Sequence, residues 1–263
     1  MTGFAELMPT AHEAVDIASE LIRTRWPGRV TSKGDRDMAT EVDYEIEQRL
    51  RTLLRQRTPH IGFIGEEEGA VTGDSDLIWV LDPIDGTANF LHGIPLCGVS
   101  LGLLCQDRPV LGVIDLPLLV MRYSAVEGDG AVGPHGTLHH SATSRLSDAI
   151  VAVGDYAVGP DADERNARRL TITARLAATA QRVRMHGSVV VDLAWLAEGR
   201  IDAVIVLSNK PWDTTAGVII AREAGAVVLD QSGARHSRSS TATIATSPGL
   251  VSQMIPLLHD AET

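Results

Sequence analysis

Two aspartates at the end of an apolar run are the residues best placed to do chemistry. Asp82 and Asp85 follow the apolar residues 77–81 on one tight turn, three positions apart, with a proline between them. Two carboxylates on one loop can hold hard divalent cations through oxygen ligands. Gly86 and Thr87 come next, and their N–H groups could bind a phosphate oxygen if they open a helix or turn. The alternative for an isolated pair of this spacing is a solvated turn.

Two further acidic segments could contribute to the same chemistry. Residues 66–68 are three glutamates that end the hydrophobic run 61–65. Adjacent carboxylates repel one another, so this run requires either cations or full solvation as a wet loop. Asp213 lies in the segment Lys-Pro-Trp-Asp-Thr-Thr-Ala-Gly that starts at Lys210. This segment predicts the start of a helix, with Asp213 as its N-cap in the purely structural interpretation.

The elements that must position these residues follow from hydrophobic periodicity. Apolar side chains at helical spacing predict a helix over residues 4–25, ended by Trp-Pro-Gly, and a second helix over residues 40–57. Short apolar runs separated by turn residues predict an antiparallel sheet. Its strands are expected at residues 77–81, 98–104, 110–114 and 121–126.

The second half of the chain alternates strands with helices, which is typical of an α/β unit. The predicted strands are residues 150–153, 182–185, 201–207 and 226–229, and the predicted helices are residues 163–178, 188–198 and 214–224. We predict one unit over residues 1–263, with an N-terminal α+β lobe at about 1–140 and a C-terminal α/β lobe at about 141–263. The seam is expected within residues 128–147, which are rich in glycine and histidine.

Composition excludes several classes of partner. The formal net charge of −11, with no clustered basic face, argues against nucleic acid. The sequence predicts neither a secretion signal nor a membrane span. Cys97 and Cys105 are the only cysteines, which favours a reducing, cytoplasmic compartment. Only two of the 23 basic residues are lysines, and both Lys33 and Lys210 stand close to acidic segments.

Taken in order, the acidic segments resemble the inositol monophosphatase family. The motifs are Gly-Glu-Glu at residues 65–67, Asp-Pro-Ile-Asp-Gly-Thr at 82–87 and Trp-Asp-x-x-Ala-Gly at 212–217. Residues 33–43 resemble the N-terminal acidic motif of the same family, and the resemblance extends to about Gly225. It implies a layered αβαβα sandwich of the α/β (α+β) class and a Mg²⁺-dependent phosphomonoesterase.

The resemblance also implies a set of metal ligands for two to three Mg²⁺ ions. Glu66, Asp82 and the backbone carbonyl of Ile84 would bind the first ion, and Asp82, Asp85 and Asp213 would bind the second. In some members Glu66 and water hold a third ion. Carboxylates suit this task because Mg²⁺ prefers oxygen donors. The ions would lower the pKa of the attacking water and stabilise the leaving alkoxide.

Catalytic and substrate-binding roles are implied in the same way. Asp43 would hydrogen-bond to Thr87, and Thr87 with Glu66 would orient the water for direct in-line attack, without a phosphoenzyme. Phosphate and substrate would be bound by Asp85, Gly86, Thr87, Gly187, Ser188 and Lys210. A homodimer and inhibition by lithium are further expectations of the resemblance.

The sequence leaves the substrate open. In the inositol-phosphatase branch, an acidic residue seven positions before the Asp of Trp-Asp contacts a substrate hydroxyl, and Val206 occupies that position here. An aliphatic side chain cannot accept that hydrogen bond, and a buried unpaired hydroxyl costs about 1–3 kcal/mol. We expect an inositol-1-phosphate-like, sugar or polyol phosphate. The alternatives are histidinol phosphate, a 3′-phosphoadenosine-type nucleotide, or a catalytically silent binding or regulatory protein.

Other patterns point to no different chemistry. Residues 128–133 fit Gly-x-Gly-x-x-Gly, but Pro-His-Gly follows them in place of a helix, so we predict a β-turn rather than a dinucleotide site. The nine histidines show no zinc-binding spacing. The sequence also contains no Gly-x-Ser-x-Gly nucleophile elbow.

Overall fold

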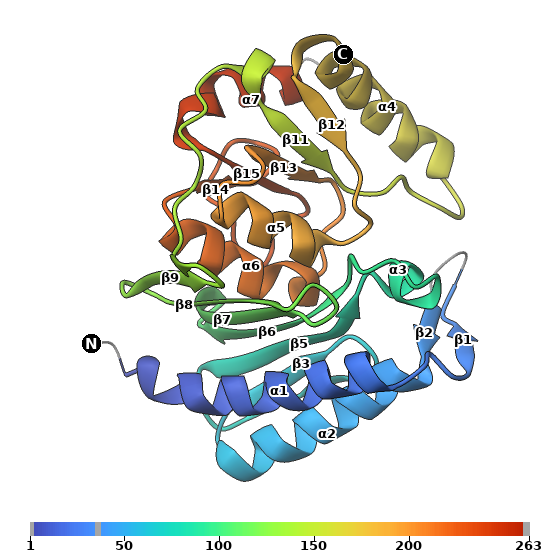
Figure 1. The fold of residues 1–263 in the computed structure, drawn as a ribbon, viewed down its shortest axis with the longest axis vertical. Coiled ribbons are helices and arrows are strands. Elements are labelled where there is room, and N and C mark those ends of the chain that lie inside the picture. The colour runs from blue at the N-terminus through green and yellow to red at the C-terminus, as the bar shows by residue number, and fades with distance from the viewer. Residues whose placement is uncertain (1–2, 35–37, 260–263) are drawn as a thin grey trace.

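The computed structural model describes residues 3–34 and 38–259, which form five alternating layers of helices and sheets (Figure 1). An outer pair of helices, α1 and α2, covers an eight-stranded sheet, and α5 and α6 separate this sheet from a five-stranded sheet. Helices α4 and α7 cover the outer face of the second sheet. The bounds are α1 Met8–Thr24, α2 Glu41–Arg57, α4 Ala162–Thr179, α5 Val189–Ala197, α6 Pro211–Glu223 and α7 Val251–His259. The predicted αβαβα sandwich is confirmed.

The first helical layer matches its prediction closely. A short 3-10 helix, Ala5–Leu7, leads into α1, and α2 begins directly after Thr40. Thr40 caps α2, because its hydroxyl accepts hydrogen bonds from the N–H groups of Val42 and Asp43 at 3.2 and 3.4 Å. In return, Asp43 Oδ2 accepts the N–H of Thr40 at 2.8 Å, which completes a capping box. Residues 35–37, part of the acidic motif 33–43, lie outside the described residues.

The eight-stranded sheet has the order β10-β9-β8-β7-β6-β5-β3-β4. Its strands are β3 Gly62–Gly65, β4 Gly69–Val71, β5 Leu77–Asp85, β6 Gly98–Cys105, β7 Arg108–Leu116, β8 Met121–Val126, β9 Gly130–Gly133 and β10 Gly136–Thr137. The four predicted strands, β5 to β8, pair antiparallel as expected. Strands β3, β4, β9 and β10 were not predicted, and β3 runs parallel to β5. Residues 128–133 were predicted as a β-turn; the turn covers residues 127–129, and strand β9 occupies the rest. Strand β10 follows it in place of a helix, so this segment is not a dinucleotide fingerprint.

The five-stranded sheet has the order β12-β11-β13-β15-β14. Its strands are β11 Ile150–Val153, β12 Arg182–Arg184, β13 Ala203–Val206, β14 Val227–Leu229 and β15 Thr243–Thr246. The predicted alternation of strands and helices is confirmed, whereas β15 and α7 were not predicted. The two sheets meet in sequence between residues 137 and 150, and the division into lobes at about residue 140 stays a prediction. A two-stranded ribbon, β1 Val30–Ser32 and β2 Met38–Thr40, and the short helix α3 Thr87–Leu91 complete the elements near the site.

Helix α6 lies unusually close to the first sheet, and this contact positions the site. Two glycines face it: a Cβ added at Gly102 on β6 would lie 2.4 Å from Thr215, and one at Gly112 on β7 would lie 2.7 Å from the carbonyl oxygen of Ala216. Side chains at these positions would push the helix away from the sheet. The glycines therefore let the first turn of α6, with Asp213, approach the end of β5. Among the described residues, no helix combines the length and apolarity needed to cross a bilayer.

Candidate metal and phosphate site

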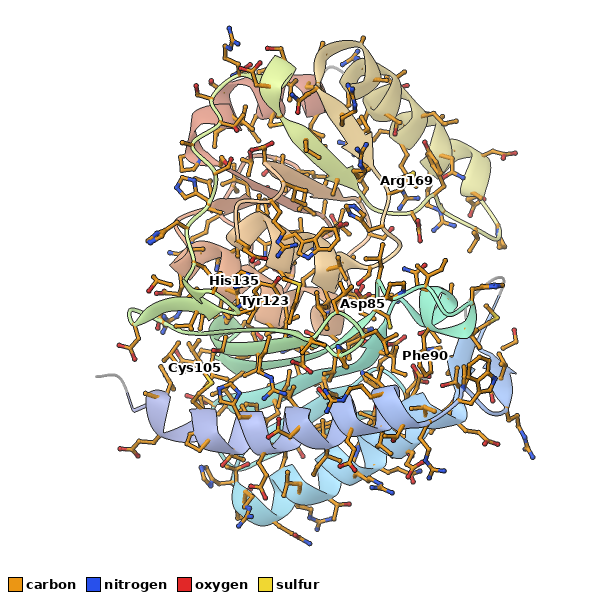
Figure 2. All side chains as sticks on the ribbon, in the orientation of Figure 1. Asp85, Phe90, Cys105, Tyr123, His135 and Arg169 are labelled. Carbon is orange, nitrogen blue, oxygen red and sulfur yellow. The ribbon has the colours of Figure 1, made fainter. Side chains whose placement is uncertain are left out.

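Three carboxylates from two elements converge where the eight-stranded sheet meets α6. Asp82 and Asp85 lie at the end of β5, and each offers an oxygen within 4.8 Å of one from Asp213 on α6. Figure 2 shows Asp85 at this junction between the sheet and the central helices. The predicted strand ended before Asp82, but β5 continues through Asp85, and its pairing with β6 changes register between the two aspartates. This irregularity contributes to the placement of both carboxylates at one edge.

Asp213 is not the N-cap of its helix, so that structural interpretation is wrong. Lys210 is the N-cap of α6, Pro211 takes the first helical position, and Asp213 lies two residues further into the first turn. Proline is well suited to that first position because its missing N–H would have no partner there. The side chain of Asp213 is therefore free of the capping role and lines the pocket together with Asp82 and Asp85.

The electrostatics of the three carboxylates are those of a site built for cations. Burial, with added repulsion from Glu66, raises the pKa of Asp82 well above its usual range. Burial, with repulsion from Asp85, does the same to the pKa of Asp213. Burial raises the pKa of Asp85 to about 7 despite hydrogen bonds from Ser188 and Val190. Asp82 is 2% exposed, and its Oδ1 has no hydrogen-bond partner among the described residues. Buried, mutually repelling oxygens of this kind fit a bound divalent ion.

Glu66 follows β3 and joins the site beside a lysine. Lys33 Nζ donates to Glu66 Oε1 at 2.7 Å and to Glu67 Oε1 at 2.9 Å. Burial of Glu67 raises its pKa to about 7, although Lys33 opposes this shift. Residues 66–68 are therefore not simply a wet loop. Lys33 was not among the predicted site residues; its rarity as one of only two lysines was the available signal.

The turn after β5 places Gly86 and Thr87 at the start of the short helix α3. Gly86 has φ of +83°, and a Cβ there would lie 2.9 Å from the carbonyl oxygen of Leu96, so only glycine fits. Helix α3 begins at Thr87, directly after this turn. The Thr87 hydroxyl donates to the carbonyl oxygen of Ile84 at 2.9 Å.

The predicted hydrogen bond between Asp43 and Thr87 is absent from the described part of the chain. Asp43 uses Oδ2 to cap α2 through Thr40, and its Oδ1 is buried without a partner among the described residues. Burial raises the pKa of Asp43 to about 6. The expectation is corrected because the capping box fixes this carboxylate against its own helix, while the Thr87 hydroxyl is held by Ile84.

Gly187 and Ser188 lie next to the carboxylates, as expected, but Ser188 contacts a carboxylate directly. Its hydroxyl donates to Asp85 Oδ2 at 2.5 Å, and the N–H of Val190 donates to the same oxygen at 2.8 Å. Ser188 also caps α5 by accepting the N–H of Val191 at 3.2 Å. Helix α5 thus orients Asp85 through its N-terminal turn.

Most predicted site residues line one pocket of about 450 Å³. The predicted residues that line it are Glu66, Asp82, Ile84, Asp85, Gly86, Thr87, Lys210 and Asp213. Lys33 and Trp212 line it as well. Among the described residues, Asp43 does not line this pocket.

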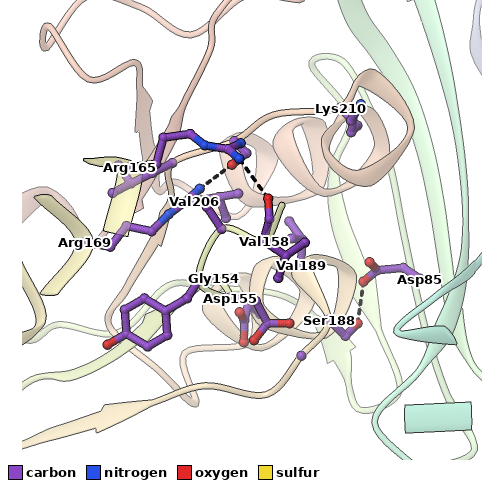
Figure 3. Close-up of a pocket in the computed structure, with 16 residues that line it drawn as sticks. Asp85, Gly154, Asp155, Val158, Arg165, Arg169, Ser188, Val189, Val206 and Lys210 are labelled. Carbon is purple, nitrogen blue, oxygen red and sulfur yellow. Dashed lines mark hydrogen bonds between the residues drawn. The ribbon is translucent and has the colours of Figure 1, made fainter. Parts of the chain in front are cut away.

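A second pocket of about 420 Å³ adjoins the first and shares Asp85 and Lys210 with it (Figure 3). Gly187, Ser188 and Val206 line this second pocket. Val206 is 4% exposed, so a buried aliphatic side chain occupies the position where the inositol-phosphatase branch has an acidic residue. Arg165 and Arg169 on α4 also line it and were not predicted, because nothing in their local sequence distinguishes them from the other arginines.

Comparisons with known proteins agree with this geometry. A sequence model of the Inositol monophosphatase family matches residues 5–262. The chain is 35% identical to inositol-1-monophosphatase ImpA of Mycolicibacterium smegmatis, over 96% of this chain and 91% of that protein. It is 34% identical to inositol monophosphatase 1 of Solanum lycopersicum, over 98% of this chain and 96% of that protein.

Two solved structures share the fold. The extragenic suppressor protein SuhB of Bartonella henselae superposes with a TM-score of 0.90 at 29% identity, covering 96% of this chain and 98% of that one. The IMPase of Thermotoga maritima superposes with a TM-score of 0.89 at 26% identity, covering 98% of each chain.

Proposed function

Because the chain belongs to the inositol monophosphatase family, and so is a phosphoric monoester hydrolase of inositol phosphate-like substrates, we propose that it is a Mg²⁺-dependent enzyme. The observation that carries the proposal is the cluster of buried Asp82 with half-buried Asp85 and Asp213, whose carboxylate oxygens lie within 4.8 Å of one another. Three carboxylates this close, one of them buried and two half-buried, are unfavourable unless cations or protons compensate them. Oxygen donors alone are the ligand set that Mg²⁺ prefers.

We propose that the site binds two or three Mg²⁺ ions. Glu66, Asp82 and the carbonyl of Ile84 would hold one ion, and Asp82, Asp85 and Asp213 would hold another. Bound Mg²⁺ would lower the pKa of the attacking water and neutralise charge on the phosphate and the leaving oxygen. The Oδ1 of Asp82 supports this assignment, because it is buried without a hydrogen-bond partner among the described residues.

The remaining site residues would bind the phosphate and orient the attacking water. The N–H groups of Gly86 and Thr87, at the start of α3, would hold the phosphate, and the Thr87 hydroxyl with Glu66 would orient the attacking water. Lys33 fixes the carboxylate of Glu66 by its 2.7 Å hydrogen bond. Asp43 acts indirectly in this scheme, because it caps α2. Lys210 lines both pockets and would face the substrate.

The comparisons do not favour the alternative substrates. The relatives named above are inositol monophosphatases, which supports an inositol phosphate-like substrate over histidinol phosphate or a 3′-phosphoadenosine-type nucleotide. A catalytically silent protein is not favoured either.

We further propose a homodimer, sensitivity to lithium and a cytoplasmic location. Cys97 and Cys105 are unpaired, which supports a reducing compartment. The mass of the native protein tests the first of these proposals, and a lithium titration at saturating substrate tests the second.

Phosphate release tests the proposed activity. We expect turnover of an inositol phosphate-like monoester with Mg²⁺, loss of turnover in EDTA, and recovery when Mg²⁺ is added back. Asp213→Asn should lower kcat by at least about 10³-fold, because it removes a ligand that the ion needs in the transition state. Asp129→Asn, at an exposed turn outside the site, is the matched control and should retain wild-type turnover. Wild-type turnover by Asp213→Asn would refute its role as a ligand.

A further inference from the structure

The pocket beside the carboxylates holds a buried arginine with no acidic partner. Arg169, on α4, is only 5% exposed. Its Nη2 donates to the hydroxyl of Ser208, while its Nη1 is buried and has no hydrogen-bond partner among the described residues. Burial, and the neighbouring charge of Arg165, lower the pKa of Arg169. A buried guanidinium without an anion is costly, so this position calls for a negatively charged ligand.

Arg169 lines the pocket that adjoins the carboxylate site and shares Asp85 with it. The pocket of about 420 Å³ contains Arg165 and Arg169 at one end and Asp85 with Ser188 at the other, with Val206 beside the arginines (Figure 3). Arg165 lies at the exposed rim, where its Nη2 donates to the carbonyl oxygens of Val158 and Pro160 at 2.8 and 3.0 Å.

The wall that carries these arginines is held in place before any ligand binds. The side-chain amide of Asn166 accepts the N–H of Ala157 at 2.7 Å and donates to its carbonyl oxygen at 2.9 Å. The Tyr156 hydroxyl also donates to the hydroxyl of Thr173, on α4, at 3.3 Å. The segment between β11 and α4 is thereby fastened to the helix, so a ligand would meet a preformed surface.

The acidic residues of this pocket do not neutralise the arginines. Asp192 Oδ1 lies 2.5 Å from Nδ1 of His186, with which it pairs. Asp155 is exposed, and Asp85 Oδ2 accepts hydrogen bonds from Ser188 and Val190. None of these three aspartates forms an ion pair with Arg165 or Arg169 in the described part of the chain, so the pocket leaves room for an external anion beside the arginines.

We propose that the preferred substrate carries a second phosphate, which Arg169 and Arg165 bind while the first phosphate lies at the Asp82 cluster. The inference rests on the proposed function of that cluster. A guanidinium can donate two parallel hydrogen bonds to a phosphate, which suits the free Nη1 of Arg169. Val206 accepts no hydroxyl hydrogen bond beside it, so recognition at this end of the pocket depends on charge rather than on a sugar hydroxyl.

The chemistry of the reaction leaves the second phosphate untouched. The oxygen of water bonds to the phosphorus of the first phosphate, the ester P–O bond breaks, and the alcohol oxygen takes a proton. The second phosphate stays on the alcohol product and remains a ligand of the arginines until the product leaves.

Paired substrates test the proposal kinetically. Inositol 1-phosphate is compared with inositol 1,4-bisphosphate, and fructose 1-phosphate with fructose 1,6-bisphosphate. We expect the wild type to show kcat/KM at least about tenfold higher for a bisphosphate than for its monophosphate. Arg169→Gln should reduce that ratio about 10- to 100-fold, mainly through KM, and Arg169→Lys should restore part of it. Arg23→Gln, at an exposed position on α1, is the control and should keep the wild-type ratio.

Binding provides a readout that does not depend on turnover. Calorimetric titration of inositol 1,4-bisphosphate in EDTA, where no turnover is expected, should give at least about tenfold weaker binding to the Arg169→Gln protein than to the wild type. An unchanged Kd, or an unchanged substrate ratio in Arg169→Gln, would overturn the proposal. If no phosphoester is hydrolysed with Mg²⁺ but Arg169→Gln still weakens binding, the proposed activity fails while the second-phosphate site stands.

Discussion

The metal-free enzyme should become more stable when one ligand of the carboxylate cluster loses its charge. Oxygens of Asp82, Asp85 and Asp213 lie within 4.8 Å of one another, and two unit charges at that distance repel by about 3.5 kcal/mol at an effective dielectric constant of 20. Asp82→Asn removes two of the three pair repulsions while keeping the shape of the side chain. Because proton uptake already relieves part of this repulsion, we expect a gain of about 2–4 kcal/mol at pH 8 in EDTA.

The gain is measured as the free energy of unfolding and as Tm in EDTA. For a chain of this size the gain corresponds to a rise in Tm of about 4–12 °C. It should shrink as the pH falls through about 7 and disappear near pH 4, since the wild-type carboxylates then carry protons in the folded state. The same substitution should abolish stabilisation by Mg²⁺ and lower kcat by at least about 10³-fold.

Asp129→Asn is the control, because this exposed side chain lies outside the cluster. An Asp82→Asn protein that is no more stable than the wild type at pH 8 would refute the argument from charge repulsion. An equal gain at pH 4 and pH 8 would refute it as well, since it would show a packing effect.

Three further outcomes follow from the site and its supports. Mg²⁺ affinity, measured by titration calorimetry, should fall as the pH drops through about 7. The reason is that the pKa of Asp85 is raised to about 7, so protons compete with the ion below that pH. An affinity that does not change between pH 6 and pH 8 would contradict this prediction. Gly112→Ala should destabilise the protein by about 1–3 kcal/mol in urea unfolding and weaken Mg²⁺ binding, because the added Cβ would lie 2.7 Å from the carbonyl oxygen of Ala216 on α6. Gly128→Ala is the control: its added Cβ would have no atom within 4 Å, so the Mg²⁺ affinity should not change. Lys33→Met should lower kcat/KM about tenfold or more by releasing the carboxylate of Glu66, whereas wild-type kinetics would place Lys33 outside the machinery.

The sequence by itself determined the local elements and the identity of the carboxylates that are proposed to bind metal. Helices α1 and α2 follow from apolar side chains at helical spacing, and the start of α2 follows from the Thr40 cap. Both signals depend only on residues that are close to one another in the sequence. The cluster could be predicted because its motifs resemble those of a known family: Asp82 and Asp85 lie three positions apart at the end of a strand, and Asp213 lies in the first turn of a helix. Strand β3 was not predicted, because two of its four residues are glycines, which are rare in strands. It also pairs with β5 in parallel, so the two strands do not form the hairpin that a short connection would indicate.

Only the tertiary structure decided which groups face one another across the layers. Gly102 and Gly112 set the distance of α6 from the sheet, and the capping box of α2 occupies Asp43 in place of the expected contact with Thr87. The pairing of Lys33 with Glu66 joins residues 33 positions apart, and the unpaired Nη1 of Arg169 emerges only once burial is known. Periodicity and motif spacing describe a segment and its near neighbours. Whether a charge is buried, paired or left without a partner depends on segments that meet only when the layers pack.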